Sequence, residues 1–286
     1  MGRMAFRSGL RGALCSGVCG VGVALAVLLM VFVFSGGALA QSAPKGFLAD
    51  EGNPPPGANN PKCEPTKKHP YPVVLVHGTF ETMDQNWAVL SPRLKKQGYC
   101  VYALNYNNRG MGPIGESAQE LDRFVNGVLG ITGAKRVQLV GHSQGGMMPR
   151  YWIKYLGGAE KVEDLVGIAP SNYGTNLNDA FGDPSGMCQA CAQQNADSRF
   201  IRRLNRGDDT PGRGSFTQIA TRNDEIIVPY TNCFLRGTER TRNITIQNFN
   251  NGLPVTHQNI YNDTFVQRLV FDALANPGPA NPQRAF

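Results

Sequence analysis

A serine between glycines follows an apolar segment, residues 137–140. We predict that this segment is a buried strand and that a helix begins directly after the serine. The stretch around the serine reads Gly-His-Ser-Gln-Gly-Gly over residues 141–146. A strand-to-helix turn this tight leaves no room for side chains two positions before and after the serine, which accounts for Gly141 and Gly145. The turn lifts the hydroxyl above the sheet edge, where it can attack a carbonyl carbon. We take Ser143 as the candidate nucleophile; the alternative is a tight turn with a solvated serine.

A serine hydroxyl needs a base to take its proton, and in triads built on such a turn the order along the chain is serine, acid, histidine. Of the four histidines, only His257 follows Ser143. It lies between the last predicted strand and the closing helix, where a loop can reach back over the sheet. We expect His257 to be the base; the alternative is a surface histidine that caps the helix.

The acid should follow a strand that lies between the nucleophile and the histidine. Asp224 comes shortly after the predicted strand 216–220. A buried carboxylate on the far ring nitrogen of His257 would hold the correct tautomer and stabilise the imidazolium. We choose Asp224 for its position, with its neighbour Glu225 as the main rival. Weaker candidates in the preceding polar segment are Asp208 and Asp209.

Acyl transfer also needs hydrogen-bond donors for the negatively charged oxygen of the tetrahedral intermediate. One donor is the backbone amide of the residue after the nucleophile, here Gln144. The second should come from the loop after the first strand, where His77-Gly78-Thr79-Phe80 follows residues 73–76. We assign it to the Thr79 amide, with its hydroxyl as an additional donor. The alternative, an ordinary glycine turn, would leave this oxyanion hole half built.

His77 and His142 each flank a glycine in these two loops. We expect both to be packed or hydrogen-bonded supports of the loop backbones. With no carboxylates arranged around them as ligands, a metal site is not predicted, and the chemistry requires no cofactor. No oxygen-ligand motif of the EF-hand kind is present for a structural calcium.

Apolar strand-like runs alternate with amphipathic helical stretches, which predicts a mainly parallel, doubly wound α/β sheet with helices on both faces. A polar, Gly-rich stretch at 171–214 should be an excursion over the active-site end, and it is the one stretch long enough for a lid. The predicted strands are 73–76, 100–104, 137–140, 165–168, 216–220 and 243–247. The predicted helices are 87–96, 116–129, 145–156 and 261–274.

Residues 1–40 are typical of a cleavable export signal, because basic residues precede an apolar run at 18–34 and a small-residue site. The alternative is an uncleaved membrane anchor. Residues 41–61, rich in Pro, Gly and Asn, predict an extended or loosely held arm, and 62–286 one catalytic domain. We expect the protein to be secreted, and to be a monomer.

The formal net charge of +7 gives no case for a nucleic-acid partner, because three of the basic residues lie in the leader. The cluster Arg202, Arg203 and Arg206 is typical of a solvated face, without interleaved aromatic residues.

An exported chain should oxidise its cysteines. A disulfide between Cys63 and Cys100 is plausible. For Cys188 and Cys191 we expect a structural disulfide, with Cys233 as a possible participant. The alternative for Cys188 and Cys191 is half of a redox or zinc motif.

Several segments taken in order resemble the secreted actinobacterial triacylglycerol lipases and esterases of the α/β-hydrolase superfamily. The resemblance runs over nearly the whole mature chain and implies a lipase-like esterase, the triad Ser143, Asp224 and His257, and oxyanion donors at Thr79 and Gln144. A cysteine shortly before the histidine in those relatives is replaced here by Asn248 and Phe249, which puts a bridge near that loop in doubt. The segments are PVVLVHGTF (72–80), NW (86–87), VQLVGHSQGG (137–146), TRNDEIIVPY (221–230) and His257.

The substrate class is less defined, because the same triad serves lipases, short-chain or polyester esterases, thioesterases and peptidases. Lipid esters, with contact to a lipid interface, are expected from the resemblance. Apolar candidates for an acyl-chain mouth are Phe80, Met147, Met148 and Phe181, each of which could equally belong to the core. A different class of function is a non-catalytic envelope protein that uses the hydrolase scaffold as a binding module.

Overall fold

Six short parallel strands form one sheet in the computed structural model of the chain, which describes residues 52–176 and 187–286. The strand order is β2-β1-β3-β4-β5-β6. The strands are β1 (Val73–Val76), β2 (Val101–Leu104), β3 (Val137–His142), β4 (Val162–Ile168), β5 (Ser215–Ala220) and β6 (Thr241–Thr245). The predicted leader, with the alternative anchor at 18–34, lies outside the described residues.

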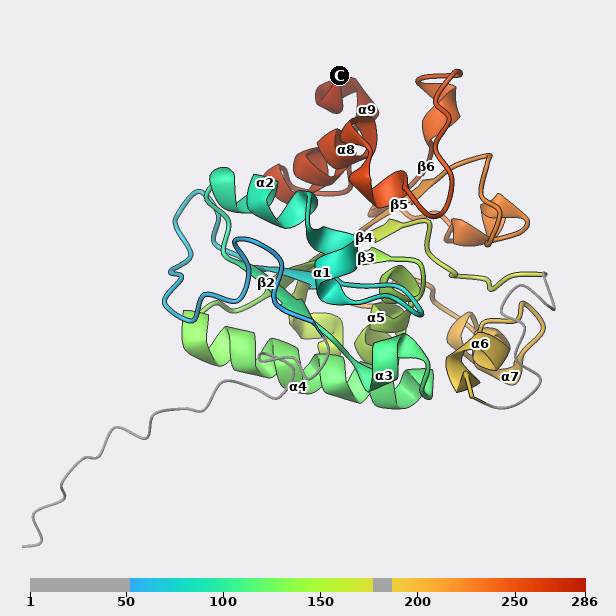
Figure 1. Cartoon of the computed structure of the whole chain (residues 1–286), viewed down its shortest axis with the longest axis horizontal. Coiled ribbons are helices and arrows are strands. Elements are labelled where there is room, and N and C mark those ends of the chain that lie inside the picture. The colour runs from blue at the N-terminus through green and yellow to red at the C-terminus, as the bar shows by residue number, and fades with distance from the viewer. Residues whose placement is uncertain (1–51, 177–186) are drawn as a thin grey trace, which may run out of the picture. The chain divides into compact units, whose positions relative to one another are not determined.

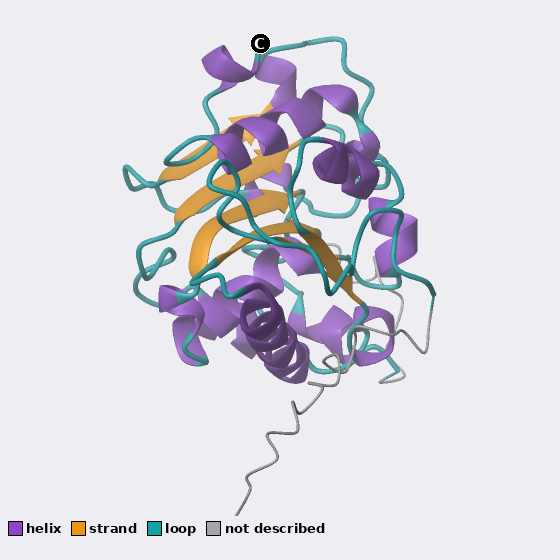
Figure 2. Cartoon of the chain, turned by 90° about the vertical axis from the view of Figure 1, so that its left-hand side faces the viewer, coloured by secondary structure: helices purple, strands orange, loops and turns teal. Residues whose placement is uncertain are grey.

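Helices cover both faces of the sheet, which explains why β1, β3 and β4 are buried along almost their whole length instead of on alternate residues (Figures 1 and 2). Successive residues of β1 point to opposite faces. Val74 and Val76 belong to the apolar cluster of α4 and α5, whereas Val73 and Leu75 belong to that of α1, α2 and α8. These helices are α1 (Met83–Trp87), α2 (Leu90–Lys96), α4 (Ile114–Thr132), α5 (Gln144–Tyr155) and α8 (Thr264–Ala275).

The remaining described helices lie in connections between these elements or after α8. They are α3 (Asn107–Gly110), α6 (Gln189–Gln193), α7 (Arg199–Leu204) and α9 (Pro282–Ala285). The excursion predicted at 171–214 contains α6 and α7 and adds no strand among its described residues. No helix in the described part of the chain is long and apolar enough to cross a membrane.

The predicted helix 87–96 is two helices, and the first starts four residues earlier, at Met83. The Met83 amide donates to the Oδ1 atom of Asn105, 2.7 Å away, so a residue from beyond β2 satisfies the first turn. A helix terminus leaves amides without intrahelical partners, and here the partner comes from 22 positions further along the chain. Local sequence patterns cannot reveal such a contact.

The described part of the N-terminal arm lies against β2. Ala58 pairs with Val101, and the Asn59 side chain both donates to and accepts from the backbone of Ala103. A disulfide joins Cys63 to Cys100, the residue directly before the same strand. This bridge is one that the sequence made plausible, and it ties the arm to the sheet.

The second disulfide joins Cys188 to Cys191 across the start of α6. Cys233 takes no part in it and is a free, fully buried thiol. Burial raises the pKa of Cys233 well above its usual value, so the thiol stays protonated. In the described ranges, no group of three or more His, Cys, Asp or Glu side chains is placed to hold a metal ion.

Asp164 of β4 is a carboxyl group buried inside the sheet, with 3% of its surface exposed. Gln138 and Ser215 donate to it from the neighbouring strands, at 2.7 and 2.5 Å. Burial raises its pKa from 3.8 to about 7, and these two hydrogen bonds offset only part of that effect. The folded protein therefore holds a proton on Asp164 at pH values where the unfolded chain has lost it.

We expect Asp164 to make the free energy of unfolding fall as pH rises from about 4 to 7, because its pKa in the folded state exceeds the unfolded value. The contribution of Asp164 to the free energy of unfolding is complete below about pH 4 and is lost as the pH rises through about 7. Asp164→Asn mimics the protonated carboxyl and should remove this loss, on the order of a few kcal/mol. Urea titrations of both proteins at pH 5 and pH 8 measure it; equal pH dependence in the two proteins would contradict the assignment.

Candidate active site

Ser143 occupies a strained turn between β3 and α5, with φ 52° and ψ −123°. Its amide donates to the Ile168 carbonyl of β4 at 2.9 Å, and its carbonyl accepts from Gly146. A Cβ at Gly141 would lie 1.9 Å from the Gly145 carbonyl oxygen, and one at Gly145 would lie 2.2 Å from that of Val76. The two glycines are thus needed for close backbone contact, as the sequence predicted.

Asp224 and His257 meet at the carboxyl end of the sheet, beyond β5. The Asp224 carboxylate lies 3.0 Å from His257 Nδ1, and both side chains are buried. It also accepts, through Oδ1, from the amides of Ile226 and Ile227 at 3.0 and 2.7 Å. The carboxylate is thereby oriented before it meets the ring, and the ring keeps Nε2 as its free proton-accepting nitrogen.

The rival carboxylates take other places. Glu225 accepts from the backbone amide of His257 at 2.9 Å and so contacts the loop instead of the ring. Asp209 is buried among the OH of Tyr173, Arg150 and Arg236. Asp208 accepts from the amide of Thr210 in the same loop.

Ser143 and His257 are not hydrogen-bonded to each other in the described structure. They are joined through His142, whose ring lies 4.8 Å from the His257 ring and whose Nε2 donates to the His257 carbonyl oxygen at 3.1 Å. A catalytic contact of this kind is often long in a free enzyme and closes when substrate binds. His142 thus holds the Ser143 turn against the loop that carries His257.

Glu81, which no sequence pattern singled out, contacts both the His142 ring and the loop after β1. Its Oε2 atom lies 2.9 Å from His142 Nδ1 and accepts from the Gly78 amide at 3.0 Å. Burial by itself raises the pKa of Glu81. The charge and hydrogen bond of His142 outweigh this effect, and the pKa falls from 4.5 to about 2. The His142 ring thus lies between a carboxylate oxygen at Nδ1 and the His257 carbonyl oxygen at Nε2, and it links the residues that carry these two groups. A lone acidic residue in a loop gives no sequence signal of this role.

The two predicted oxyanion donors lie side by side. Thr79 follows β1, Gln144 begins α5, and the Gln144 side-chain Nε2 donates to Thr79 Oγ1 at 2.7 Å. Among the described residues, the backbone amides of Thr79 and Gln144 donate to no protein atom. Two free amides beside Ser143 can bind a developing oxyanion, and the positive end of the α5 dipole reinforces them.

His77 and His142 are both packed into the loops they flank. His77 stacks on Tyr106 with ring centroids 4.3 Å apart, and its Nδ1 lies 2.7 Å from the Gly78 carbonyl oxygen. Burial lowers the pKa of His77 to about 4, so it is neutral near pH 7. It supports the loop that carries Thr79 without adding charge to the site.

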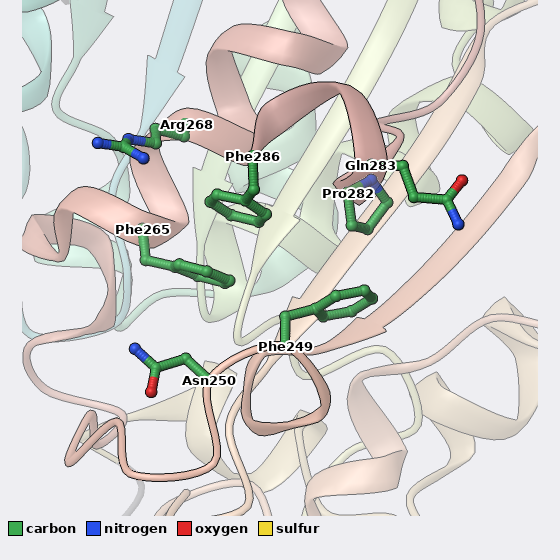
Figure 3. A pocket seen from close by; sticks show the side chains of 7 residues that line it. All are labelled: Phe249, Asn250, Phe265, Arg268, Pro282, Gln283 and Phe286. Atoms are coloured by element: carbon green, nitrogen blue, oxygen red, sulfur yellow. The ribbon is translucent and has the colours of Figure 1, made fainter.

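A separate hollow lies between α8, α9 and the loop after β6. Figure 3 shows the rings of Phe249, Phe265 and Phe286 around it, while Arg268 points away from them. Phe265 and Phe286 stack with centroids 3.8 Å apart. None of the candidate catalytic residues lines this hollow.

Comparison with known proteins places these features in a family. A family model described as Lipase (class 2) matches residues 70–269. A triacylglycerol lipase of Pseudarthrobacter phenanthrenivorans is 40% identical over 88 residues, which cover 28% of this chain and 27% of that protein. A triacylglycerol lipase of Burkholderia plantarii is 40% identical over 88 residues, covering 28% and 24%. The chain therefore spans about a quarter of the length of these curated relatives.

Solved structures share the fold at low sequence identity. Lipase B of Aspergillus fumigatus superposes with a TM-score of 0.66 at 23% identity, over 76% of this chain and 55% of that one. The mature form of a Bacillus licheniformis lipase gives a TM-score of 0.56 at 16% identity, over 79% of this chain and 100% of that one. The class 2 lipase model covers well over half of the residues, and the structure has the doubly wound parallel sheet of the α/β-hydrolases. The chain therefore belongs to the class 2 lipase family of the α/β-hydrolase superfamily.

Proposed function

We propose that the protein is a serine carboxylic-ester hydrolase that acts on lipid esters, with Ser143 as nucleophile, His257 as base and Asp224 as acid. The buried Asp224–His257 pair carries the proposal, because it lies at the sheet edge that also presents the strained Ser143 turn. A carboxylate held at Nδ1 leaves Nε2 to take a proton, which a serine needs to become an effective nucleophile.

In the first step Ser143 Oγ attacks the ester carbonyl carbon while His257 Nε2 takes the hydroxyl proton. The carbonyl oxygen becomes an oxyanion, which the Thr79 and Gln144 amides and the Thr79 hydroxyl stabilise. The imidazolium then gives its proton to the alcohol, which leaves, and Ser143 remains acylated. Asp224 stabilises the imidazolium throughout.

In the second step water attacks the acyl-enzyme and His257 takes the water's proton. The same donors hold the second oxyanion, after which the carboxylic acid leaves and the serine recovers its proton. Every step uses side chains and amides of this chain, so the hydrolysis is complete without a cofactor. The buried Asp224–His257 pair keeps its geometry through both steps.

Two features support a lipid ester as substrate. The curated relatives are named triacylglycerol lipases, and Phe80, next to Thr79, exposes 40% of its surface beside the site. Met147 and Met148, by contrast, are fully buried in the core cluster, so they are not mouth residues. Phe181 lies outside the described residues.

Export also belongs to the proposal. The leader-like residues 1–40 and two disulfides support it, since disulfides persist in oxidising compartments outside the cytosol. The mature enzyme would then meet its substrates at lipid surfaces or droplets outside the cell.

The mature protein should hydrolyse p-nitrophenyl esters from acetate to palmitate and an emulsified triglyceride, and Ser143→Ala should lose about 10⁴-fold or more in kcat. Titrimetry and release of p-nitrophenol measure the two reactions. Turnover of short soluble esters alone would make the protein an esterase instead of a lipase. Substantial activity of Ser143→Ala, or none in the wild type, would reject the serine mechanism.

Asp224→Asn should lower kcat by about 10³-fold or more while KM changes little, because the amide cannot hold the same tautomer of His257. Glu225→Gln is the matched control: its amide oxygen still accepts the His257 backbone N–H, so the loss should stay below about tenfold. Steady-state kinetics on one soluble ester compare them. A larger loss in the Glu225 variant would exchange the two assignments.

A further inference from the structure

The Thr79 hydroxyl accepts a hydrogen bond from the side chain of Gln144. The orientation of this amide follows from its second contact, since Gln144 Nε2 also lies 2.7 Å from the carbonyl oxygen of Gly110. A carbonyl oxygen only accepts, so the atom facing it must be the nitrogen. One hydrogen of the NH₂ group goes to Gly110 and the other to Thr79.

Gln194, just after α6, approaches the same hydroxyl from the other side. Its Nε2 atom lies 3.0 Å from Thr79 Oγ1 and 3.2 Å from the Ala190 carbonyl oxygen, which again identifies the nitrogen. Its Oε1 atom accepts from the Ser171 hydroxyl at 2.8 Å. The side chain is fully buried and fixed at both ends.

A hydroxyl oxygen has two lone pairs and one hydrogen. In Thr79 the two glutamine amides occupy both lone pairs, so the hydroxyl can only donate in its remaining direction. We propose that Gln194 is a positioning residue of the oxyanion hole, which together with the Gln144 side chain fixes the Thr79 hydroxyl as a donor to the oxyanion. The inference rests on the proposed hydrolase function and extends it to a residue that never touches the substrate.

The short helix α6 holds Gln194 in place. The disulfide between Cys188 and Cys191 closes its first turn, and the Ala190 amide donates to the Met111 carbonyl at 3.0 Å. The Ile114 amide of α4 donates to the side-chain oxygen of Gln193 at 2.8 Å. A five-residue helix is too short to be stable by itself, so these attachments make it a fixed platform. The Cys-x-x-Cys staple thereby supports the oxyanion hole.

The test reverses one hydrogen bond. In Gln194→Glu the carboxylate only accepts, so the Thr79 hydroxyl should turn and donate to it, and the oxyanion loses a donor. We expect kcat on a soluble ester to fall about 100-fold with KM nearly unchanged. Gln193→Glu adds the same charge one residue away, and its carboxylate still accepts from Ile114, so it should keep wild-type kcat within about threefold.

A neutral double-mutant cycle isolates the hydroxyl. Gln194→Met should lower kcat about tenfold in the wild type, but less than about twofold in a Thr79→Val background, where there is no hydroxyl left to orient. Thr79→Ser keeps the hydroxyl and should restore the sensitivity to Gln194→Met. Near-UV circular dichroism and the thermal midpoint check the fold; should Gln194→Glu not fold, this cycle decides alone.

Equal losses from Gln194→Met in the wild-type and Thr79→Val backgrounds, or a Gln194→Glu enzyme within about threefold of wild type, would overturn the inference. Either result would leave the hydrolase proposal intact, because the wild type would still be active. A wild type without Ser143-dependent hydrolysis would overturn both. The positioning role is supported if the losses from Gln194→Met and Thr79→Val are non-additive and affect kcat alone.

Discussion

The close approach of three backbone segments at the β3–α5 turn is the constraint on which the site depends. Gly145 packs against the carbonyl oxygens of Val76 and His77, at the end of β1, so the Ser143 turn and the loop after β1 share one contact. Any side chain at Gly145 would separate them. The positive φ of Ser143 is an unfavourable conformation that persists because its amide is also bonded to β4.

Next to this turn, His257 is held by its backbone as much as by its ring. The His257 amide donates to Glu225, its carbonyl accepts from His142, and its Nδ1 meets Asp224. Buried polar groups that are fully paired resist displacement, because breaking any pair leaves an unsatisfied group away from water. The loop between β6 and α8 is thereby held in place, and Glu81 links it, through His142, to the loop after β1.

Much of the fold could be predicted because buried parallel strands are continuous apolar runs. The β1 strand falls on the predicted residues 73–76, and α5 begins within one residue of its expected start. The errors occur where contacts from distant residues matter. Asn105 extends the first helix to Met83. The pairing among Cys188, Cys191 and Cys233, which the sequence left open, also depends on such contacts, and Cys233 is the buried free thiol.

The sequence by itself determined the order of strands and helices, the tight turn at Ser143 and the chain order that selects Asp224 and His257, because these depend on local periodicity, on glycines and on few alternatives. Only the tertiary structure decided which carboxylate faces the histidine ring, since Asp224 and Glu225 are adjacent and differ in direction alone. It also decided where Glu81, His142 and Gln194 lie. Each makes a hydrogen bond to a residue 61 to 115 positions away, and such pairing exists only once the chain has folded.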